Sequence, residues 1–129
     1  MSSLKCPKCS SPLETVSYQG ITVERCRACA GIWFERCDIE QLKAIKGSET
    51  LDIGQSQTNP SDDRSQPYCS CPHCREAMMQ MLDIDQYAIW YEKCLKCQGV
   101  WLDAGEFTQY KQNFSSKGLL HRVRLALGL

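Results

Sequence analysis

Eight of the ten cysteines in this chain of 129 residues occur in four Cys-x-x-Cys pairs, which form two copies of one larger pattern. The two sets are Cys6, Cys9, Cys26 and Cys29, and Cys71, Cys74, Cys94 and Cys97. Sixteen residues separate the pairs of the first set and nineteen those of the second, a spacing typical of paired-cysteine zinc sites. Four thiolates can close a tetrahedral shell around one Zn²⁺, so the sequence predicts two structural zinc ions.

Each copy is too small to depend on an apolar core alone. The repeat divides the chain into units of about 45 residues, a size at which such a core is marginal. A structural zinc site contributes on the order of 10 kcal/mol or more to folding at neutral pH. We therefore expect both units to be largely unfolded without zinc.

The expected compartment decides how the cysteines are interpreted. Residues 1–5 contain no apolar segment of a secretory signal peptide, and no apolar run predicts a transmembrane helix. We expect a cytoplasmic protein, or one imported into an organellar stroma or matrix. Paired cysteines in such a reducing compartment favour metal binding, with a disulfide framework as the alternative.

The sequence outside the cysteines predicts the same elements twice. β-Branched and aromatic residues flank a turn within 13–25 and again within 78–91, which predicts two β-hairpins. A short strand follows each second cysteine pair at 32–34 and 100–102, and a helix follows the strand. The predicted fold is a small metal-stabilised α+β protein, in which a flexible linker joins two zinc-ribbon units, each a hairpin with a short C-terminal helix.

Composition divides the chain into four predicted segments. The first zinc ribbon with its helix spans 1–47, and the second spans 67–114. Residues 48–66 are polar and acidic, which predicts a flexible linker. Residues 115–129 form a basic amphipathic tail, of which 117–129 could bind an anionic membrane surface, fill a partner's groove or cover an apolar edge of the second ribbon.

Tryptophans and carboxylates near the cysteines are expected to have structural roles. Trp33 and Trp101 follow the last cysteine of each set and should cover the metal site of their own unit inside the core. Asp103 and Glu106 have capping-box spacing, which predicts a helix beginning near Ala104 rather than a catalytic pair. We predict no catalytic residues.

The repeated motifs resemble those of a known family. A Cys-Pro-x-Cys motif begins at Cys6 and Cys71, and a Cys-x-x-Cys-x-Gly-x-Trp motif begins at Cys26 and Cys94. These motifs resemble the small bacterial and organellar zinc ribbons named after the zinc ribbon of transcription factor IIB. The second copy is the closer match, because Leu-Asp-Ala-Gly-Glu follows Trp101. The resemblance implies a zinc ribbon with an appended helix, and the family name suggests transcription.

These observations favour a non-enzymatic module that presents surfaces to a macromolecule, with transcription or assembly as the expected process. Fifteen basic residues balance fifteen acidic ones, whereas dedicated nucleic-acid binders usually carry a basic stripe, so we favour a protein partner. No small-molecule substrate is expected. Nucleic acid stays an alternative because aromatic and basic side chains alternate at Tyr87, Trp90, Tyr91, Lys93 and Lys96.

Thiol chemistry gives the second hypothesis. A four-cysteine site can hold iron, as in rubredoxin-like electron carriers, and Cys-x-x-Cys pairs can exchange disulfides, as in a thiol-disulfide chaperone. The remaining cysteines, Cys37 and Cys69, are expected to be inert, with redox sensing as the alternative.

Overall fold

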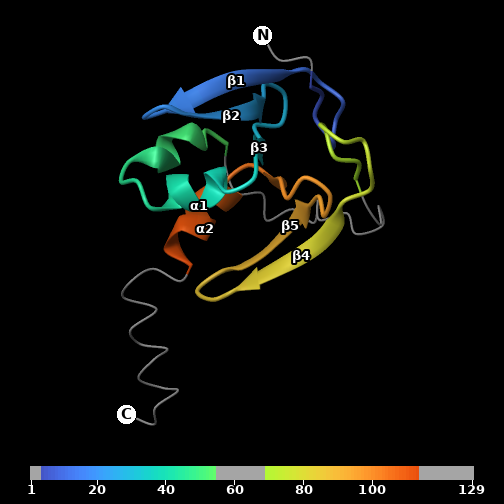
Figure 1. The fold of residues 1–129 in the computed structure, drawn as a ribbon. Coiled ribbons are helices and arrows are strands. Elements are labelled where there is room, and N and C mark those ends of the chain that lie inside the picture. Colours follow the sequence, from blue (N-terminus) through green and yellow to red (C-terminus); the bar gives the residue numbers. More distant parts are fainter. Residues whose placement is uncertain (1–3, 55–68, 114–129) are drawn as a thin grey trace.

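The computed structural model describes residues 4–54 and 69–113 and contains six strands and three helical segments in these ranges (Figure 1). The first half comprises β1 (Leu13–Tyr18), β2 (Ile21–Cys26), β3 (Ile32–Phe34), α1 (Asp38–Lys43) and the 3₁₀ helix η1 (Ser48–Leu51). The second half comprises β4 (Met79–Ile84), β5 (Ala88–Lys93), β6 (Val100–Leu102) and α2 (Glu106–Gln112). The predicted small α+β fold is confirmed, and both predicted hairpins are present as β1–β2 and β4–β5.

The two ribbons join into one antiparallel sheet with the strand order β1-β2-β3-β6-β5-β4. The central pair is β3–β6, in which Trp33 lies directly opposite Trp101. Because each three-residue strand would otherwise leave one edge unpaired, mutual pairing satisfies the backbone of both. The expected units are therefore not connected by a linker alone, since they share a continuous sheet.

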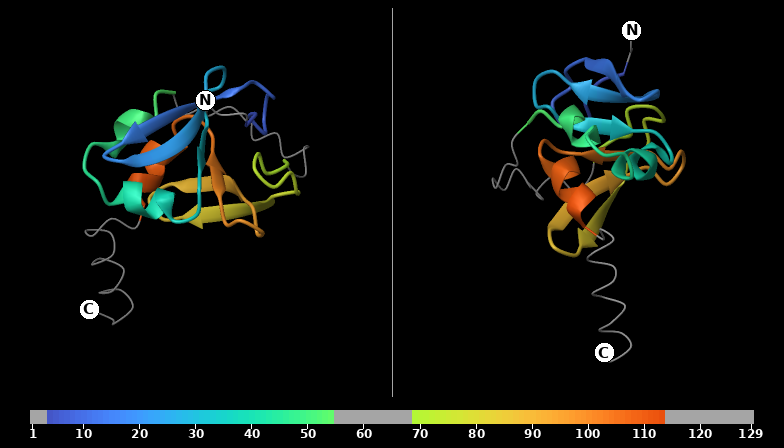
Figure 2. Two further views of the ribbon diagram at one scale, coloured as in Figure 1. Left: turned by 45° about the horizontal axis from the view of Figure 1, so that its top comes forward. Right: turned by 90° about the vertical axis from the view of Figure 1, so that its left-hand side faces the viewer.

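The helices pack between the two hairpins, which lie at opposite ends of the molecule in Figure 1 and in the right-hand view of Figure 2. Ile39 and Leu42 of α1 and Phe107 of α2 are buried in a cluster that also contains Phe34. The rings of Phe34 and Phe107 have centroids 5.1 Å apart, so a residue of β3 packs against the helix of the other half. The core thus crosses the boundary between the two sequence repeats.

The structure differs from the expected linker at its beginning. Gly47 adopts φ 92°, and the 3₁₀ helix that follows places Ser48 and Leu51 in the interior. The Ser48 hydroxyl donates to the Leu42 carbonyl at 2.5 Å, and Arg25 donates to the Leu51 carbonyl at 2.9 Å. Residues 48–54 therefore belong to the folded body, while 55–66 and the predicted tail lie outside the described residues.

The helices are shorter than the sequence suggests. The helix α1 has only six residues, Asp38–Lys43, and α2 begins at Glu106 rather than near Ala104. Both N-caps, Cys37 and Gly105, are in the left-handed conformation with φ 72° and 84°. Within the described ranges, no helix has the length and apolar character needed to cross a bilayer.

Candidate metal centres

The eight cysteines of the two sequence sets come together in two groups of four. In each group the four sulfur atoms lie within 4.8 Å of one another. In the first group the Sγ atoms of Cys6 and Cys29 are 3.7 Å apart, and those of Cys9 and Cys26 are 3.5 Å apart. In the second group the Sγ atoms of Cys71 and Cys97 are 3.8 Å apart.

These distances fit a zinc ion and not a disulfide framework. A tetrahedral site with Zn–S bonds of about 2.3 Å places its sulfurs about 3.8 Å apart, whereas the two sulfurs of a disulfide are about 2.0 Å apart. All ten cysteines are free thiols. The predicted cofactor, two zinc ions, is confirmed by two four-cysteine groups that match the ion in donor type and spacing.

Each Cys-x-x-Cys pair is held by the same turn. The residue after the second cysteine is left-handed in all four, with φ between 65° and 69°, at Ser10, Ala30, Arg75 and Gln98. Its N–H donates to the carbonyl of the first cysteine at 2.8 to 2.9 Å. This turn also directs backbone N–H groups at sulfur, as at Lys8, whose N–H lies 3.3 Å from the Cys6 Sγ. Such donors stabilise thiolates and orient them toward a common centre.

The thiols within each group differ in acidity. The hydrogen bond from Cys6 lowers the pKa of Cys29 to about 5, while that same contact and burial raise the pKa of Cys6. In the second group, burial alone would raise the pKa of Cys94, but backbone donors from Cys97 and Lys96 lower it to about 7. Each group therefore contains a thiol with a lowered pKa, and metal binding must displace the proton of Cys6 or Cys71, whose pKa is raised.

The tryptophans connect the two metal centres, so neither covers the site of its own unit alone. Both indoles are fully buried, in one cluster with Cys6 and Cys26 of the first set and Cys71 and Cys94 of the second. A Cβ atom added at Gly31 would overlap the ring of Trp101, and one added at Gly99 would overlap the ring of Trp33. Each ring therefore packs against the glycine of the other ribbon. Both Gly-x-Trp motifs are visible in the sequence, but this exchange is not.

Two carboxylates that follow the tryptophans hold the indoles. Trp33 Nε1 donates to Glu35 at 2.6 Å, and Trp101 Nε1 donates to Asp103 at 3.0 Å. The N–H of Asp103 donates to the Glu106 carboxylate at 2.8 Å, which is half of the predicted capping box. Because Asp103 accepts from the indole, it positions Trp101 as well as preceding the helix.

An ion pair between a half-buried lysine and a buried carboxylate also crosses between the ribbons. Lys8, inside the first Cys-x-x-Cys pair, contacts Glu92 of β5 at 3.0 Å and Asp103 at 3.6 Å. Burial alone would lower the pKa of Lys8, but the two carboxylates outweigh it and raise the pKa. Only 5% of the Glu92 side chain is exposed, so the charged Lys8 is its neutralising neighbour. Lys8 of the first metal centre thus neutralises the buried Glu92 carboxylate beside the second.

The two remaining cysteines lie in different surroundings. Cys37 is exposed at the N-cap of α1, the position that Gly105 occupies before α2. Cys69 is buried in the cluster that contains both metal groups, and burial raises its pKa. The group near Cys69 contains Cys71, as the repeat alignment predicts. That both thiols are inert stays a prediction, with redox sensing as its alternative.

The chain was compared with known proteins. A family model described as transcription factor zinc-finger matches residues 5–45 and 70–113, which together make up more than half of the chain. No match was found among the curated proteins or the solved structures.

Proposed function

Because this chain belongs to the transcription factor zinc-finger family, we propose that it is a non-enzymatic binding module in which two zinc ions hold a surface for a protein partner. Four thiolates around each ion leave no coordination position for a substrate or an activated water. The metal then contributes to the free energy of folding rather than to a reaction. Function is left to the surfaces that the zinc ions hold in place.

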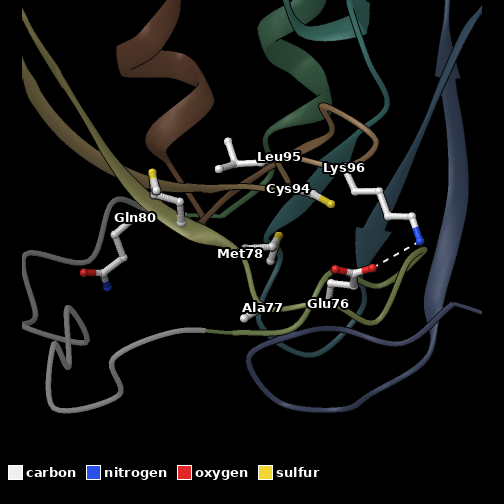
Figure 3. A pocket seen from close by; sticks show the side chains of 8 residues that line it. Glu76, Ala77, Met78, Gln80, Cys94, Leu95 and Lys96 are labelled. Atoms are coloured by element: carbon white, nitrogen blue, oxygen red, sulfur yellow. Dashed lines mark hydrogen bonds and ion pairs between the residues drawn. The ribbon is translucent and has the colours of Figure 1, made fainter.

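An apolar groove beside the second metal group is the observation that carries this proposal (Figure 3). It has a volume of about 490 Å³ and lies between residues 76–80, at the start of β4, and residues 94–96. Met79 and Leu95, which line it, are 50% and 56% exposed. Large apolar side chains left in water at this level mark interaction sites when they are contiguous.

The first ribbon supplies an internal comparison for this groove. The positions that correspond to Met79 and Leu95 in the repeat are Glu14 and Arg27. Those two side chains form an ion pair at 3.6 Å across the equivalent surface. The two ribbons share one fold but differ here in chemistry, so zinc binding alone does not account for the apolar pair of the second ribbon.

The shape and charge of the groove favour an extended segment of a protein. The strand β4 is outermost in the sheet, and an outermost strand can accept a further strand through backbone hydrogen bonds. Methionine side chains adapt to different apolar partners. At the rim, Lys96 pairs with Glu76 at 3.1 Å, so this lysine is neutralised beside the groove (Figure 3). An apolar peptide strand fits this surface better than a phosphate backbone does.

The double substitution Met79→Glu with Leu95→Arg tests the proposal, since it installs the ion pair of the first ribbon. Peptides selected from a displayed library on the zinc-loaded protein should shift the Met79 methyl resonance and should lose binding to the double variant. The control Lys96→Ala should bind them as the parent protein does. Selected peptides that bind the double variant unchanged would overturn the proposal.

Capture from a cell lysate distinguishes a protein partner from nucleic acid and identifies the biological process. Proteins retained after nuclease treatment, and lost with the double variant, support a protein partner, and their identity shows whether the process is transcription or assembly. Capture that nuclease abolishes and the double variant leaves intact would assign the module to nucleic acid instead. A reducing compartment such as the cytoplasm belongs to the same proposal, because the thiolates must stay reduced to hold zinc.

A further inference from the structure

A second groove lies where the two halves meet, and its position differs from that of the groove beside Met79. It has a volume of about 240 Å³. Its lining includes Arg36 and Cys37, just before α1, together with Lys93 of β5, Val100 of β6 and Tyr110 of α2. We call it the α1 groove. Its lining comes from both sequence repeats.

The equivalent place on the other side of the molecule is filled by residues 51–54 of this chain. At a constant offset of 68, Val100 and Lys93 of the α1 groove correspond to Ile32 and Arg25. Ile32 belongs to the same buried cluster as Leu51, which is only 5% exposed. Arg25 donates to the Leu51 carbonyl at 2.9 Å. Residues 51–54 thus show how a short segment with one apolar side chain, that of Leu51, is bound at the equivalent place.

Two further positions show the same correspondence. Cys37 of the α1 groove corresponds to Gly105, whose N–H donates to Asp52 at 2.8 Å. Arg36 corresponds to Ala104, and a Cβ added at Gly54 would overlap the Ala104 side chain. Three residues that line the α1 groove therefore have counterparts that contact residues 51–54, and the counterpart of Val100 shares a buried cluster with Leu51.

The sequence repeat continues beyond the helices at the same offset of 68. Four pairs are identical: Gln41 and Gln109, Lys43 and Lys111, Ser48 and Ser116, and Leu51 and Leu119. The first two pairs lie in α1 and α2, and the other two lie beyond these helices, with Leu51 in the segment that fills the equivalent place. Leu119 is therefore the repeat counterpart of the buried Leu51.

We propose that residues 115–122 of this chain bind the α1 groove in cis, with Leu119 against Val100 and with Lys93 donating to the backbone carbonyl of residue 119. The segment follows α2 in the chain as residues 47–54 follow α1. Asp52 has no acidic counterpart, since position 120 is leucine. Docking of this segment lacks the contact of Asp52 with the following helix, so it is weaker than the docking of residues 51–54.

Cys37 provides a direct readout in the zinc-loaded full chain. It lines the α1 groove and is exposed in the described structure, while eight cysteines form the metal groups and Cys69 is buried. If residues 115–122 bind the groove, Leu119→Asp should raise the rate of Cys37 alkylation by iodoacetamide several-fold. Leu127→Asp is the matched control, because it places the same charge in the tail beyond the repeat, and it should leave the rate unchanged.

Hydrogen exchange supplies a second measurement that does not depend on thiol chemistry. Amides of residues 117–121 should be protected in the parent chain and in Leu127→Asp, and should lose protection in Leu119→Asp. Equal alkylation rates in the parent and Leu119→Asp would overturn the proposal. It would also fail if the protection of Cys37 disappeared on dilution, since this places the segment on another molecule. Equal rates together with weaker sedimentation of Leu119→Asp on phosphatidylserine vesicles would assign Leu119 to a membrane surface instead.

Discussion

Gly31 and Gly99 bring the two ribbons into contact at the scale of single residues. Each lies two positions after the last cysteine of its set and faces the indole of the other ribbon. Neither has a left-handed backbone, so their small size, and not conformational freedom, is what the fold requires. The fully buried indoles leave no space for a methyl group at these positions.

Gly31→Ala should lower the free energy of unfolding by about 2 kcal/mol or more, because the added methyl overlaps the ring of Trp101. Denaturant unfolding of the zinc-loaded protein measures the change. Gly20→Ala is the control, since a Cβ there meets no atom within 4 Å and the left-handed backbone costs about 1 kcal/mol. Adding Trp101→Phe to Gly31→Ala should recover part of the loss. Equal effects at Gly31 and Gly20 would contradict the packing.

Lys8→Ala should destabilise the protein by about 3 kcal/mol, because it leaves the buried Glu92 carboxylate without its lysine. Adding Glu92→Gln should restore much of the stability. Lys96→Ala removes a comparable but exposed pair with Glu76 and should have no measurable effect. The comparison is made by chemical unfolding at a fixed concentration of free zinc. A Lys8→Ala variant as stable as Lys96→Ala would show that the cross-ribbon pair contributes little.

The Glu106 carboxyl should make stability depend on pH above neutrality. Burial, followed by the charge of Asp103, raises the pKa of Glu106 to about 9 from an ordinary value near 4.5. Between these values the folded state holds the proton more tightly, so its contribution to stability falls as the pH rises toward 9. Glu106→Gln retains an oxygen for the Asp103 N–H and cannot ionise. We expect the variant to show a flatter stability profile from about pH 7 to about pH 9, and an unchanged slope would refute the assignment.

At this scale the cysteines of each metal group could be predicted from the sequence, whereas the turn residues and ion pairs around them could not. Spacing alone predicts which cysteines assemble, because Cys-x-x-Cys pairs close a tetrahedral shell locally. The left-handed residues after the pairs, such as Ala30 and Gln98, carry no common signal, since none is glycine or asparagine. The Lys8–Glu92 pair joins residues 84 positions apart and follows only from the association of the ribbons.

The 3₁₀ helix η1 is the element that could not be predicted from the sequence. Its surroundings are polar and acidic, which is typical of a linker, and Leu51 alone provides a buried apolar side chain within it. The hairpins were predictable because alternating β-branched residues flank turns, as at Gln19 and Gly20, both of which are left-handed. The contact of η1 with α2 could not be predicted, because it depends on the second repeat lying beside the first.

Asp52 connects these elements by binding the N-terminal end of α2. Its carboxylate accepts from the N–H groups of Gly105 and Thr108 and from the Thr108 hydroxyl at 2.8 to 2.9 Å. Asp52→Ala should cost about 1 to 2 kcal/mol, as loss of a helix cap does. Asp52→Asn keeps one acceptor and should cost less. Amide exchange in α2 checks the prediction, and unchanged protection of Thr108 in Asp52→Ala would contradict it.

At the scale of the whole molecule, the continuous sheet makes the two zinc sites interdependent. Sequence analysis treated the ribbons as separate units, because nothing in a three-residue strand shows which edge it will pair with. In the structure, loss of order at β3 also removes the partner of β6. Metal binding at one group should therefore stabilise the other through the tryptophans and the central strands.

Cys9→Ser weakens the first zinc site and should accelerate loss of zinc from the second site by roughly tenfold, the change expected when a coupling of about 1.4 kcal/mol in zinc affinity acts on the dissociation rate. A chromogenic chelator followed over time measures the release of each equivalent. Cys37→Ser is the matched control, since it removes an exposed thiol outside both groups. Release from the second site at the parent rate in Cys9→Ser would show that the ribbons bind metal independently.

The pairing of β3 with β6 within one chain does not depend on the protein concentration. Two single-ribbon chains that met through these strands would form a dimer, and dilution would separate them. Here both strands belong to one polypeptide, so each half meets the other at an effective concentration on the order of millimolar, whatever the amount of protein present. Pairing of β3 with β6 is thus a step of folding, and the assembled sheet should persist at concentrations where a dimer of half-chains would dissociate.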